Sequence, residues 1–459
     1  MAPDSPLLRT VLVKMMSMRT VIVSDLHIGP DATPPIFAGQ QALPRLLAAQ
    51  PAQTRVILNG DSFDFLLDDA PLGLQVASAV ARARTIVGSA QAAGTVAALA
   101  ATLAAGGELI VRAGNHDLEL VLPEVQDVVR DALREAVRAG GASDDAAAAA
   151  VARVTFDDGD LPLRVRCGDR WVLVTHGEHA DPFNRWSPQA VRTAGHATTA
   201  DAEVYPPGSL LVKEILNPLK HSMRFLDLLK PDFHGAVMSA LAVNPGAARQ
   251  LVRPATLKIL SDLVRNAMDG MPFPGPGEEP DPERQFAVLL GAAGLDDEEL
   301  DVLDQLLAPE AEPFGLVDLV TGVIGRVRAK LGRAALRLYA RVHRQIAGHA
   351  GETQFDEAPS DDEWDEALRL ARKFDASAVI TGHTHARRIG QKDGVDLVNT
   401  GTWIRLMRLP AADAAIAEWV DLLEELRADP LLEHSTRAAL DGTACIVDDT
   451  GAVSVERVR

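Results

Sequence analysis

The sequence predicts an α/β fold in which strands, polar turns and helices alternate along the chain. Three stretches carry this prediction, because each is an apolar, β-branched run that ends in a polar turn and is followed by helical sequence. They are Thr20–Gly29, Arg55–Phe65 and Glu108–Asp117. Alternation of this kind favours a layered fold with ligands at the carboxyl ends of the strands, so we expect the three polar turns to lie near one another.

The other elements follow from the same patterns. Helices are predicted at Gln40–Ala49, from Leu72 to about Ala104, at Pro123–Ala152 with a break near Gly140, and near Ala411–Arg427. A hairpin is predicted from Val154–Cys167 and Arg170–Thr175, and its second strand leads to His176. Further strands are predicted at Ala378–Thr381, Val395–Asn399, Thr443–Val447 and Val453–Val458.

Residues 180–375 interrupt this layered pattern and are predicted to form a helical cap. They are helical in pattern, with a Pro/Gly loop at Met271–Pro282 and an acidic helix start at Asp296–Asp304. The layered domain therefore consists of residues 18–179 and 376–459. Residues 1–17 are predicted to be a tail or a misplaced start, since the compact pattern begins at Met18.

Composition limits the class of protein. A chain of 459 residues with 47% hydrophobic residues can build two or three units with a large core. Two cysteines fit a reducing cytosol and exclude a disulfide framework. The net charge of −19 argues against a general nucleic-acid binder. Without a secretory h-region or an apolar run of the ~20 residues that cross a bilayer, the expected location is the cytoplasm.

Seven polar residues that follow the predicted strands are candidate metal ligands. They are Asp25, His27, Asp61, Asn115, His176, His383 and His385. Oxygen and imidazole ligands without a thiolate suit Mn, Fe, Zn or Ni. Seven ligands suit two divalent ions that share a carboxylate, and two such ions about 4 Å apart can hold a phosphate. Each motif alone is usually a turn or a helix cap, but five in order after strands indicate a metal centre.

These motifs resemble those of the calcineurin-like metallophosphoesterase superfamily. The resemblance rests on Asp25-x-His27, Gly60-Asp61-x-x-Asp64, Gly114-Asn115-His116-Asp117, His176-Gly177 and Gly382-His383-x-His385, on both flanks of the insert. It implies a four-layer αββα sandwich with a large helical cap insertion. It also implies that Asp25, His27, Asp61 and His385 hold one metal ion. The other ion would be held by Asp61, Asn115, His176 and His383, with Asp61 as the bridge.

The resemblance also implies a reaction, in which a metal-bridging hydroxide attacks phosphorus. His116 would be the general acid at the leaving group, or would stabilise charge on the phosphoryl group. Asp64 would hold the other ring nitrogen of His116, although an Asp at this position can also be a cap or a turn. Asn115 would contact the phosphoryl oxygens, and Arg387 and Arg388 follow the last ligand closely enough to bind a substrate phosphate.

The motif wording is most similar to the UDP-2,3-diacylglucosamine pyrophosphatase group. Shared features are Ser24-Asp25-Leu-His27, Gly60-Asp61-x-Phe63-Asp64 and Val398-Asn399-Thr-Gly401-Thr-Trp403, and a helical lid at the place of the insert. Two departures are His116, where that group typically has Arg, and a longer insert. The resemblance therefore supports a phosphoester or pyrophosphate hydrolase more firmly than it supports that lipid.

Two basic segments of the insert allow two interpretations. Leu210–Lys230 mixes Lys and Arg with apolar residues, and Arg326–Arg344 carries a stripe of basic residues at helical spacing. Either segment could touch an anionic substrate or the headgroups at the inner membrane face. The alternative is a solvated or salt-bridged face, paired for instance with Asp296–Asp304.

The sequence therefore predicts a cytoplasmic di-metal hydrolase, with Mn favoured, whose helical cap selects a phosphorylated small-molecule, nucleotide-linked or lipid-linked substrate. One alternative is a metal-dependent DNA nuclease, which the charge of −19 disfavours although the stripe Arg326–Arg344 could be a local track. Another is a non-catalytic scaffold that keeps the fold. Scaffolds commonly lose a ligand or the catalytic His, and this sequence has every ligand and His116.

Overall fold

The computed structural model describes residues 18–31, 36–68, 72–181, 184–197, 204–220, 224–229, 355–408, 416–429, 431–440 and 442–458. Two compact units divide the chain: residues 1–206, 355–405 and 440–459 form one, and residues 207–354 and 406–439 the other. This division differs from the predicted insert at 180–375, and residues 406–439 fall outside the first unit. The tail 1–17 and the segments Met271–Pro282, Asp296–Asp304 and Arg326–Arg344 lie outside the described residues.

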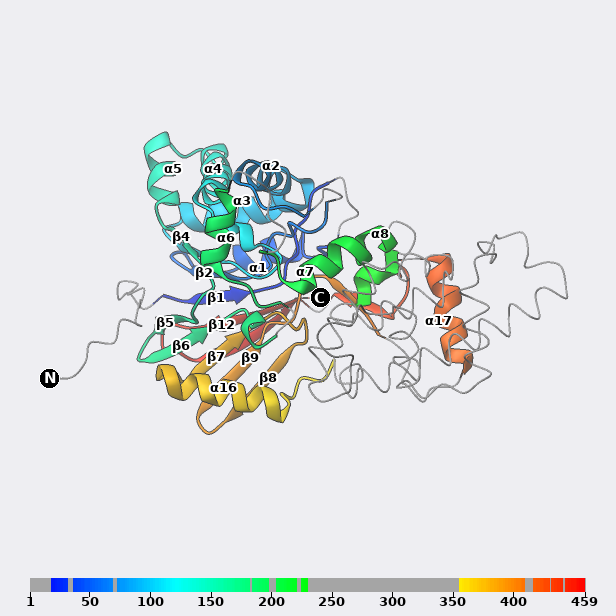
Figure 1. Cartoon of the computed structure of the whole chain (residues 1–459). Coiled ribbons are helices and arrows are strands. Elements are labelled where there is room, and N and C mark those ends of the chain that lie inside the picture. The colour runs from blue at the N-terminus through cyan, green and yellow to red at the C-terminus, as the bar shows by residue number, and fades with distance from the viewer. Residues whose placement is uncertain are drawn as a thin grey trace, which may run out of the picture. The chain divides into compact units, whose positions relative to one another are not determined.

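A six-stranded sheet forms one half of the core of the first unit (Figure 1). Its spatial order is β13 (Val453–Val458), β12 (Gly442–Val447), β1 (Thr20–Val23), β2 (Arg55–Asn59), β3 (Glu108–Arg112) and β4 (Val154–Asp157). Strands β1 to β4 are parallel, whereas β12 runs antiparallel to β1 and to β13. Strands β1 and β2 are buried along their whole length, as expected for continuous apolar runs in a parallel sheet.

A five-stranded sheet forms the other half. Its spatial order is β5 (Leu163–Cys167), β6 (Arg170–Val174), β7 (Ala378–Thr381), β9 (Val395–Asn399) and β8 (Arg388–Lys392). Strands β6, β7 and β9 are parallel, and the edge strands β5 and β8 are antiparallel to their neighbours. The two sheets share one hydrophobic cluster, in which Ile22, Ile57 and Ile110 of the first sheet meet Val172 and Ile380 of the second.

The hairpin predicted from Val154–Cys167 was wrong in its first arm. Strand β4 pairs with β3 in the six-stranded sheet, and only β5 pairs with β6. The buried Arg112 guanidinium explains the break, because it donates to the carbonyl oxygens of Gly159 and Leu161 and pairs with Asp157. These bonds hold the turn that carries the chain from one sheet to the other.

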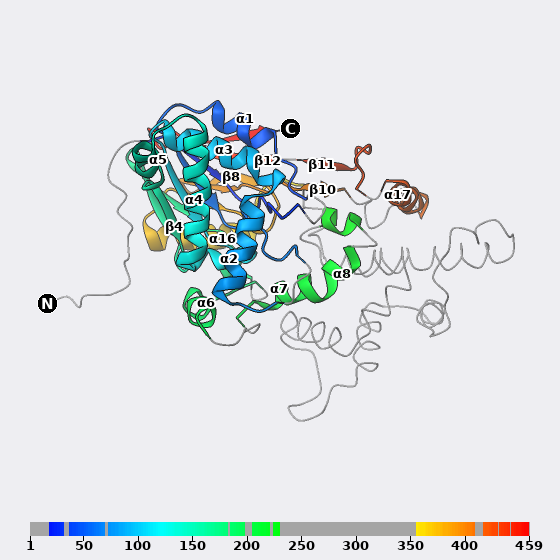
Figure 2. The ribbon, with the colours of Figure 1, turned by 90° about the horizontal axis from the view of Figure 1, so that it is seen from above.

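Helices lie on the outer faces of the two sheets (Figures 1 and 2). The helices beside the six-stranded sheet are α1 (Ala42–Ala48), α2 (Val76–Val87), α3 (Ala90–Ala104), α4 (Pro123–Ala139) and α5 (Asp144–Val151). On the five-stranded sheet, α16 (Asp361–Phe374) packs Trp364 and Leu368 against Leu173 and Val379. Facing sheets with helices outside confirm the predicted α/β class.

Local sequence explains where these helices begin and end. The predicted stretch from Leu72 to Ala104 divides at Gly88, and Ser89 caps α3 by accepting a bond from the Ala92 N–H. Helix α16 begins with a capping box between Ser360 and Glu363. No single helix in the described ranges is long and apolar enough to cross a membrane. Helices α2 and α3 would be long and apolar enough only if taken together, and the chain bends by 82° between them.

The second unit is described over short stretches. They are α7 (Pro207–Leu211), a π-helical turn at Val212–Leu216, α8 (Asn217–Lys220), a 3-10 turn at Arg224–Leu229, and α17 (Ile416–Ala428). Strands β10 (Arg405–Met407) and β11 (Ala438–Leu440) form a two-stranded sheet that we did not predict. Within the segment Leu210–Lys230, the Lys220 ammonium lies 2.6 Å from the Asp227 carboxylate. Of the two interpretations of this basic segment, Lys220 therefore fits the salt-bridged one.

A buried polar contact anchors the end of the first unit's N-terminal part. The Tyr205 hydroxyl donates to Oε1 of Glu119 at 2.7 Å, and both side chains are buried. Glu119 lies in the 3-10 turn Leu118–Val121, directly after the predicted catalytic loop. Burial raises the pKa of Glu119 to about 7, against the opposing effect of the Tyr205 hydrogen bond.

This raised pKa predicts a pH-dependent stability. The folded protein keeps a proton on Glu119 that the unfolded chain releases above pH ~4.3, so stability should fall as pH rises towards 7. Glu119→Gln has no charge to bury and should be more stable than the wild type at pH 8, by on the order of 2 kcal/mol. The advantage should shrink at pH 5. Tm values at both pH values test this, with the exposed Glu135→Gln as control; an advantage independent of pH contradicts it.

Candidate metal centre

The predicted ligands come from the ends of strands in both sheets. Asp25 and His27 follow β1, Asp61 follows β2, Asn115 follows β3, His176 follows β6, and His383 and His385 follow β7. Backbone bonds hold these ends together within each sheet. The Asp25 N–H donates to the Gly60 carbonyl, the His27 N–H to the Asp61 carbonyl, and the Gly382 N–H to the His176 carbonyl.

One cluster consists of Asp25, His27 and His385. One ligand atom of each residue lies within 4.8 Å of the others. The two imidazole Nε2 atoms are 3.1 Å apart, and Nε2 of His385 is 3.2 Å from Oδ1 of Asp25. All three side chains are buried, and they are the residues, apart from the bridging Asp61, that the resemblance assigns to the first ion.

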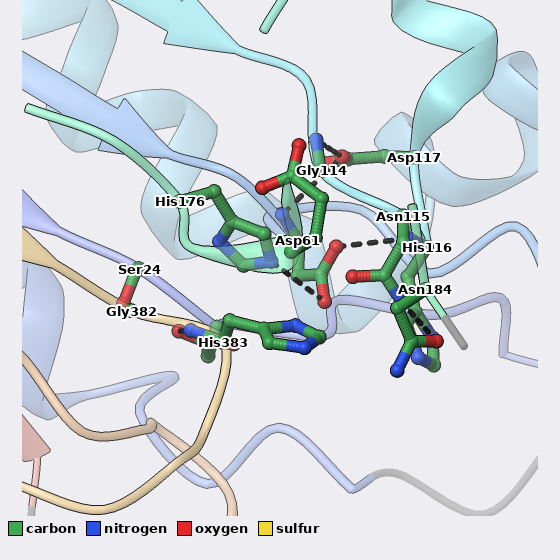
Figure 3. Close-up of polar contacts among 12 residues, drawn as sticks. Ser24, Asp61, Gly114, Asn115, His116, Asp117, His176, Asn184, Gly382 and His383 are labelled. Carbon is green, nitrogen blue, oxygen red and sulfur yellow. Dashed lines mark hydrogen bonds and ion pairs between the residues drawn. The ribbon is translucent and has the colours of Figure 1, made fainter. Parts of the chain in front are cut away.

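A second cluster consists of Asp61, His176 and His383, again with ligand atoms within 4.8 Å of one another. Nε2 of His176 lies 3.3 Å from Oδ2 of Asp61. Figure 3 shows the Asn115 side chain directed to the same point as these three. The resemblance assigns these four residues to the second ion, and the structure brings them together.

Asp64 connects the first cluster to His116. Oδ2 of Asp64 accepts a hydrogen bond from Nδ1 of His27 at 2.9 Å and lies 3.2 Å from Nδ1 of His116. The rings of His27 and His116 meet edge to face, with centroids 4.7 Å apart. Asp64 therefore orients His27, a predicted ligand, and lies within ion-pair distance of His116, the predicted general acid. The roles of general acid and ligand stay predictions.

The backbone of these loops is strained where the ligands lie. Nine non-glycine residues of the described chain have a positive φ, and five of them are predicted ligands: Asp25, His27, Asp61, His383 and His385. A left-handed conformation costs roughly 1–2 kcal/mol for most non-glycine residues. Such strain persists only where the surrounding structure fixes it, and it is concentrated at functional sites.

Glycines make room for the ligand side chains. A Cβ on Gly60 would come within 2.4 Å of the His176 ring, and a Cβ on Gly114 within 2.3 Å of the Asp61 carboxylate. A Cβ on Gly382 would come within 2.5 Å of Ser24. Close packing around the two clusters therefore requires glycine at positions 60, 114 and 382.

Asp117 fixes two of the loops through their backbone. Its buried carboxylate accepts bonds from the N–H groups of Asp61, Ser62 and Phe63 after β2, and of Gly114 after β3. The His116 N–H in turn donates to Oδ1 of Asp61 at 2.9 Å. The loops that carry Asp61 and Asn115 therefore have one fixed arrangement.

The chain after β9 supports Asp25 from the other sheet, and sequence reasoning assigned no role to it. The hydroxyls of Ser24 and Thr400 are 2.6 Å apart and share a hydrogen bond. The Thr402 hydroxyl and the Trp403 N–H both donate to the Asp25 carbonyl, at 2.9 and 3.0 Å. The Asn-Thr-Gly-Thr-Trp motif, which contributed to the family resemblance, therefore supports the Asp25 backbone through hydrogen bonds.

The carboxylates and imidazoles of the clusters shift one another's pKa values towards the charged forms. Burial alone would raise the pKa of Asp25, but the His176 and His385 imidazoles hold it at about 2. Burial would likewise raise the pKa of Asp61, but His176 and His116 hold it well below its usual range. Burial would lower the pKa of His176, whereas Asp61 and Asp25 raise it well above its usual range. Both carboxylates are thus ionised at neutral pH and attract positive charge.

The donor set fits divalent metal ions. The clusters offer carboxylate oxygens and imidazole nitrogens, and both cysteines lie instead in the core between the sheets. Oxygen and nitrogen ligands of this kind suit Mn, Fe, Zn or Ni. A cation would compete with protons for these groups, so its binding should weaken at low pH. The buried His/Asp clusters could therefore hold metal.

Arg387 and Arg388 pair with acids of the same unit. Arg387 donates to Glu357 at 2.7 Å, and Arg388 donates to Glu363 at 3.2 Å and to the Asp356 carbonyl. These contacts tie the segment before α16 to β8. Binding of a substrate phosphate by either arginine stays a prediction.

Two residues of the site were missed by sequence reasoning. Asp181 contacts His383, and Asn184 contacts both Asp181 and Asn115. Neither belongs to a recognisable motif, and the loop after His176 is too irregular for its geometry to be inferred from spacing.

Comparison with known proteins adds no assignment. The sequence matches no protein-family model, and no curated protein is significantly similar to it. The resemblance to metallophosphoesterases therefore depends on the five motifs and on the geometry described above.

The clusters predict that divalent metal stabilises the protein. A ligand that binds only the folded state at 100 times its Kd adds about 2.7 kcal/mol, which should raise Tm by roughly 5 to 10 °C. Chelator-treated protein should show this rise on addition of MnCl2. His385→Ala should reduce the rise, whereas His196→Ala, an exposed residue at the end of α6 (Pro188–Gly195), should leave it unchanged. A Tm that MnCl2 does not change would contradict the prediction.

Proposed function

We propose that this protein is a di-metal hydrolase of phosphoester or pyrophosphate bonds, a member of the calcineurin-like metallophosphoesterase superfamily with a four-layer αββα core. The observation that carries the proposal is the juxtaposition of two His/Asp clusters with His116 and Asp64. The clusters share no side chain, yet the His383 N–H of the second donates to Oδ2 of Asp25 in the first at 3.0 Å, and the charges of Asp61 and Asp25 act on each other. Two adjoining cation sites with a proton donor beside them suit hydrolysis at phosphorus.

Two divalent cations, when bound, would bring positive charge to the phosphoryl oxygens and lower the pKa of a water molecule that attacks phosphorus. Asp25, His27 and His385 would hold one of them, and Asp61, His176, His383 and Asn115 the other. In His27, Nδ1–H donates to Asp64, which leaves Nε2 as the nitrogen available for a cation.

His116 has the position of a general acid. Its Nδ1 lies 3.2 Å from Asp64, a contact that favours a proton on that nitrogen and leaves Nε2 to donate to the leaving-group oxygen. Asp64 is itself fully buried, so its charge is little screened by solvent.

The substrate class follows from the resemblance and from the size of the insert. We propose a nucleotide-linked or lipid-linked phosphate, with the insert selecting the substrate and Mn as the preferred cation. Arg387 and Arg388 remain proposed phosphate contacts that would have to exchange Glu357 and Glu363 for the substrate.

Hydrolysis assays test the proposal. With Mn present, the wild type should hydrolyse p-nitrophenyl phosphate or bis(p-nitrophenyl) phosphate, and Asp61→Ala and His383→Ala should abolish turnover because each removes a cluster residue. His116→Asn should lower kcat about 10²–10⁴-fold, the usual worth of a general acid. Asp169→Asn, whose side chain is fully exposed, is the control. Undiminished turnover in the Asp61 or His383 variant would overturn the assignment.

A further inference from the structure

The loop after β6 places a carboxylate against His383. Oδ2 of Asp181 lies 3.0 Å from Nε2 of His383 and forms a hydrogen bond with it. The other hydrogen bond of His383 that concerns this site is made by its backbone N–H, which donates to Oδ2 of Asp25 at 3.0 Å. Asp181 therefore fixes the ring of His383 at Nε2, and Asp25 fixes its backbone at the N–H.

The same loop reaches a second predicted ligand. Nδ2 of Asn184 donates to Oδ2 of Asp181 at 2.7 Å, and Oδ1 of Asn184 accepts a bond from Nδ2 of Asn115 at 3.2 Å. Because an amide that donates through Nδ2 keeps Oδ1 for other contacts, this bond sets which way the Asn115 amide faces. Figure 3 shows Asn184 beside Asn115, on the side of Asn115 opposite the Asp117 carboxylate.

Backbone bonds hold the loop in this arrangement. The Asp181 N–H donates to the Glu178 carbonyl, and the N–H groups of Asn184 and Arg185 donate to the Asp181 carbonyl. The Arg185 guanidinium donates twice to the His179 carbonyl, at 2.7 and 3.0 Å. Asp181 and Asn184 are thus positioned by a closed turn, so they can transmit a fixed geometry to His383 and Asn115.

We propose that Asp181 and Asn184 are positioning residues for the second cluster, an inference that rests on the metal centre of the proposed function. Donation from Nε2–H of His383 to Asp181 fixes the ring tautomer and leaves Nδ1 with the lone pair that a cation needs. A carboxylate partner also makes that nitrogen a stronger donor to metal. Asn184 fixes Asn115 so that its Oδ1 faces the same cation.

Asp181 acts through His383 and is not itself a cluster ligand. Among the described residues, Asp181 belongs to neither cluster, nor to the group of His27, Asp64 and His116, whose ligand atoms also lie within 4.8 Å of one another. Its side chain is 31% exposed, whereas that of Asp61 is 2% exposed. A partly exposed carboxylate that bonds a ring nitrogen of a predicted ligand, and is itself held by Asn184, has the geometry of an orienting partner.

Calorimetric titration of chelator-treated protein with MnCl2 tests the inference without any substrate. The wild type should bind two ions. Asp181→Ala should weaken one of the two sites about 10–100-fold, the usual cost of losing such a partner, and leave the other unchanged. Asp181→Asn keeps an acceptor and should lie between. Asn184→Ala should weaken the same site, and Asp160→Asn, an exposed acid that removes the same charge, should have no effect.

The outcomes separate this inference from the proposed function. Wild-type affinity at both sites in Asp181→Ala overturns the positioning role and leaves the hydrolase proposal intact. Equal weakening by Asp181→Ala, Asp181→Asn and Asp160→Asn overturns it too, because that result shows a general charge effect. A wild type that binds no Mn overturns the metal centre and this inference with it. Thermal unfolding of each chelator-treated variant establishes that it is folded before titration.

Discussion

The hydrogen bonds of Asp25 join loops of the two sheets at the place where the two clusters lie. Its N–H donates to the Gly60 carbonyl at the end of β2, within its own sheet. Its carboxylate accepts the N–H of His383, and its carbonyl accepts the Thr402 hydroxyl and the Trp403 N–H, all from the other sheet. One buried residue thus joins three loops that end at one edge of the core. The arrangement of both clusters follows from these bonds, because each cluster takes ligands from both sheets.

The same loops concentrate backbone strain, and the structure shows what compensates it. Asp25, Asp61 and His383 have left-handed backbones, and each is held by hydrogen bonds from a neighbouring loop. Asp117 contributes four further bonds to backbone N–H groups. Strain of roughly 1–2 kcal/mol per residue can persist only with such support. These hydrogen bonds therefore hold the predicted ligands of both clusters in one geometry.

Sequence reasoning reached the strands and clusters because both depend on local signals. A β-branched run followed by Asp or His at its end predicts a strand and a candidate ligand together, as at Asp25 and Asp61. The predictions from sequence failed where tertiary contacts determine the structure. The break between β4 and β5 depends on Arg112 bonding to carbonyls of a turn, and no local pattern announces that. Asp181 acquires its role from contact with His383, 202 residues away, so its place five positions after His176 carried no signal.

The separation between ligands has a consequence for biosynthesis. The imidazoles of His27 and His385 are in contact, yet the two residues are 358 positions apart in the chain. At about 5–20 residues per second, a ribosome needs roughly 20 to 70 s to pass from one to the other. Once His176 has been synthesised, the nascent chain carries Asp25, His27, Asp61 and His176 but lacks one imidazole of each cluster until residues 383 and 385 are made. Strand β6 likewise cannot pair with its parallel neighbour β7 until β7 has been synthesised. In the proposed function, the complete ligand set therefore exists only after residue 385 has been synthesised.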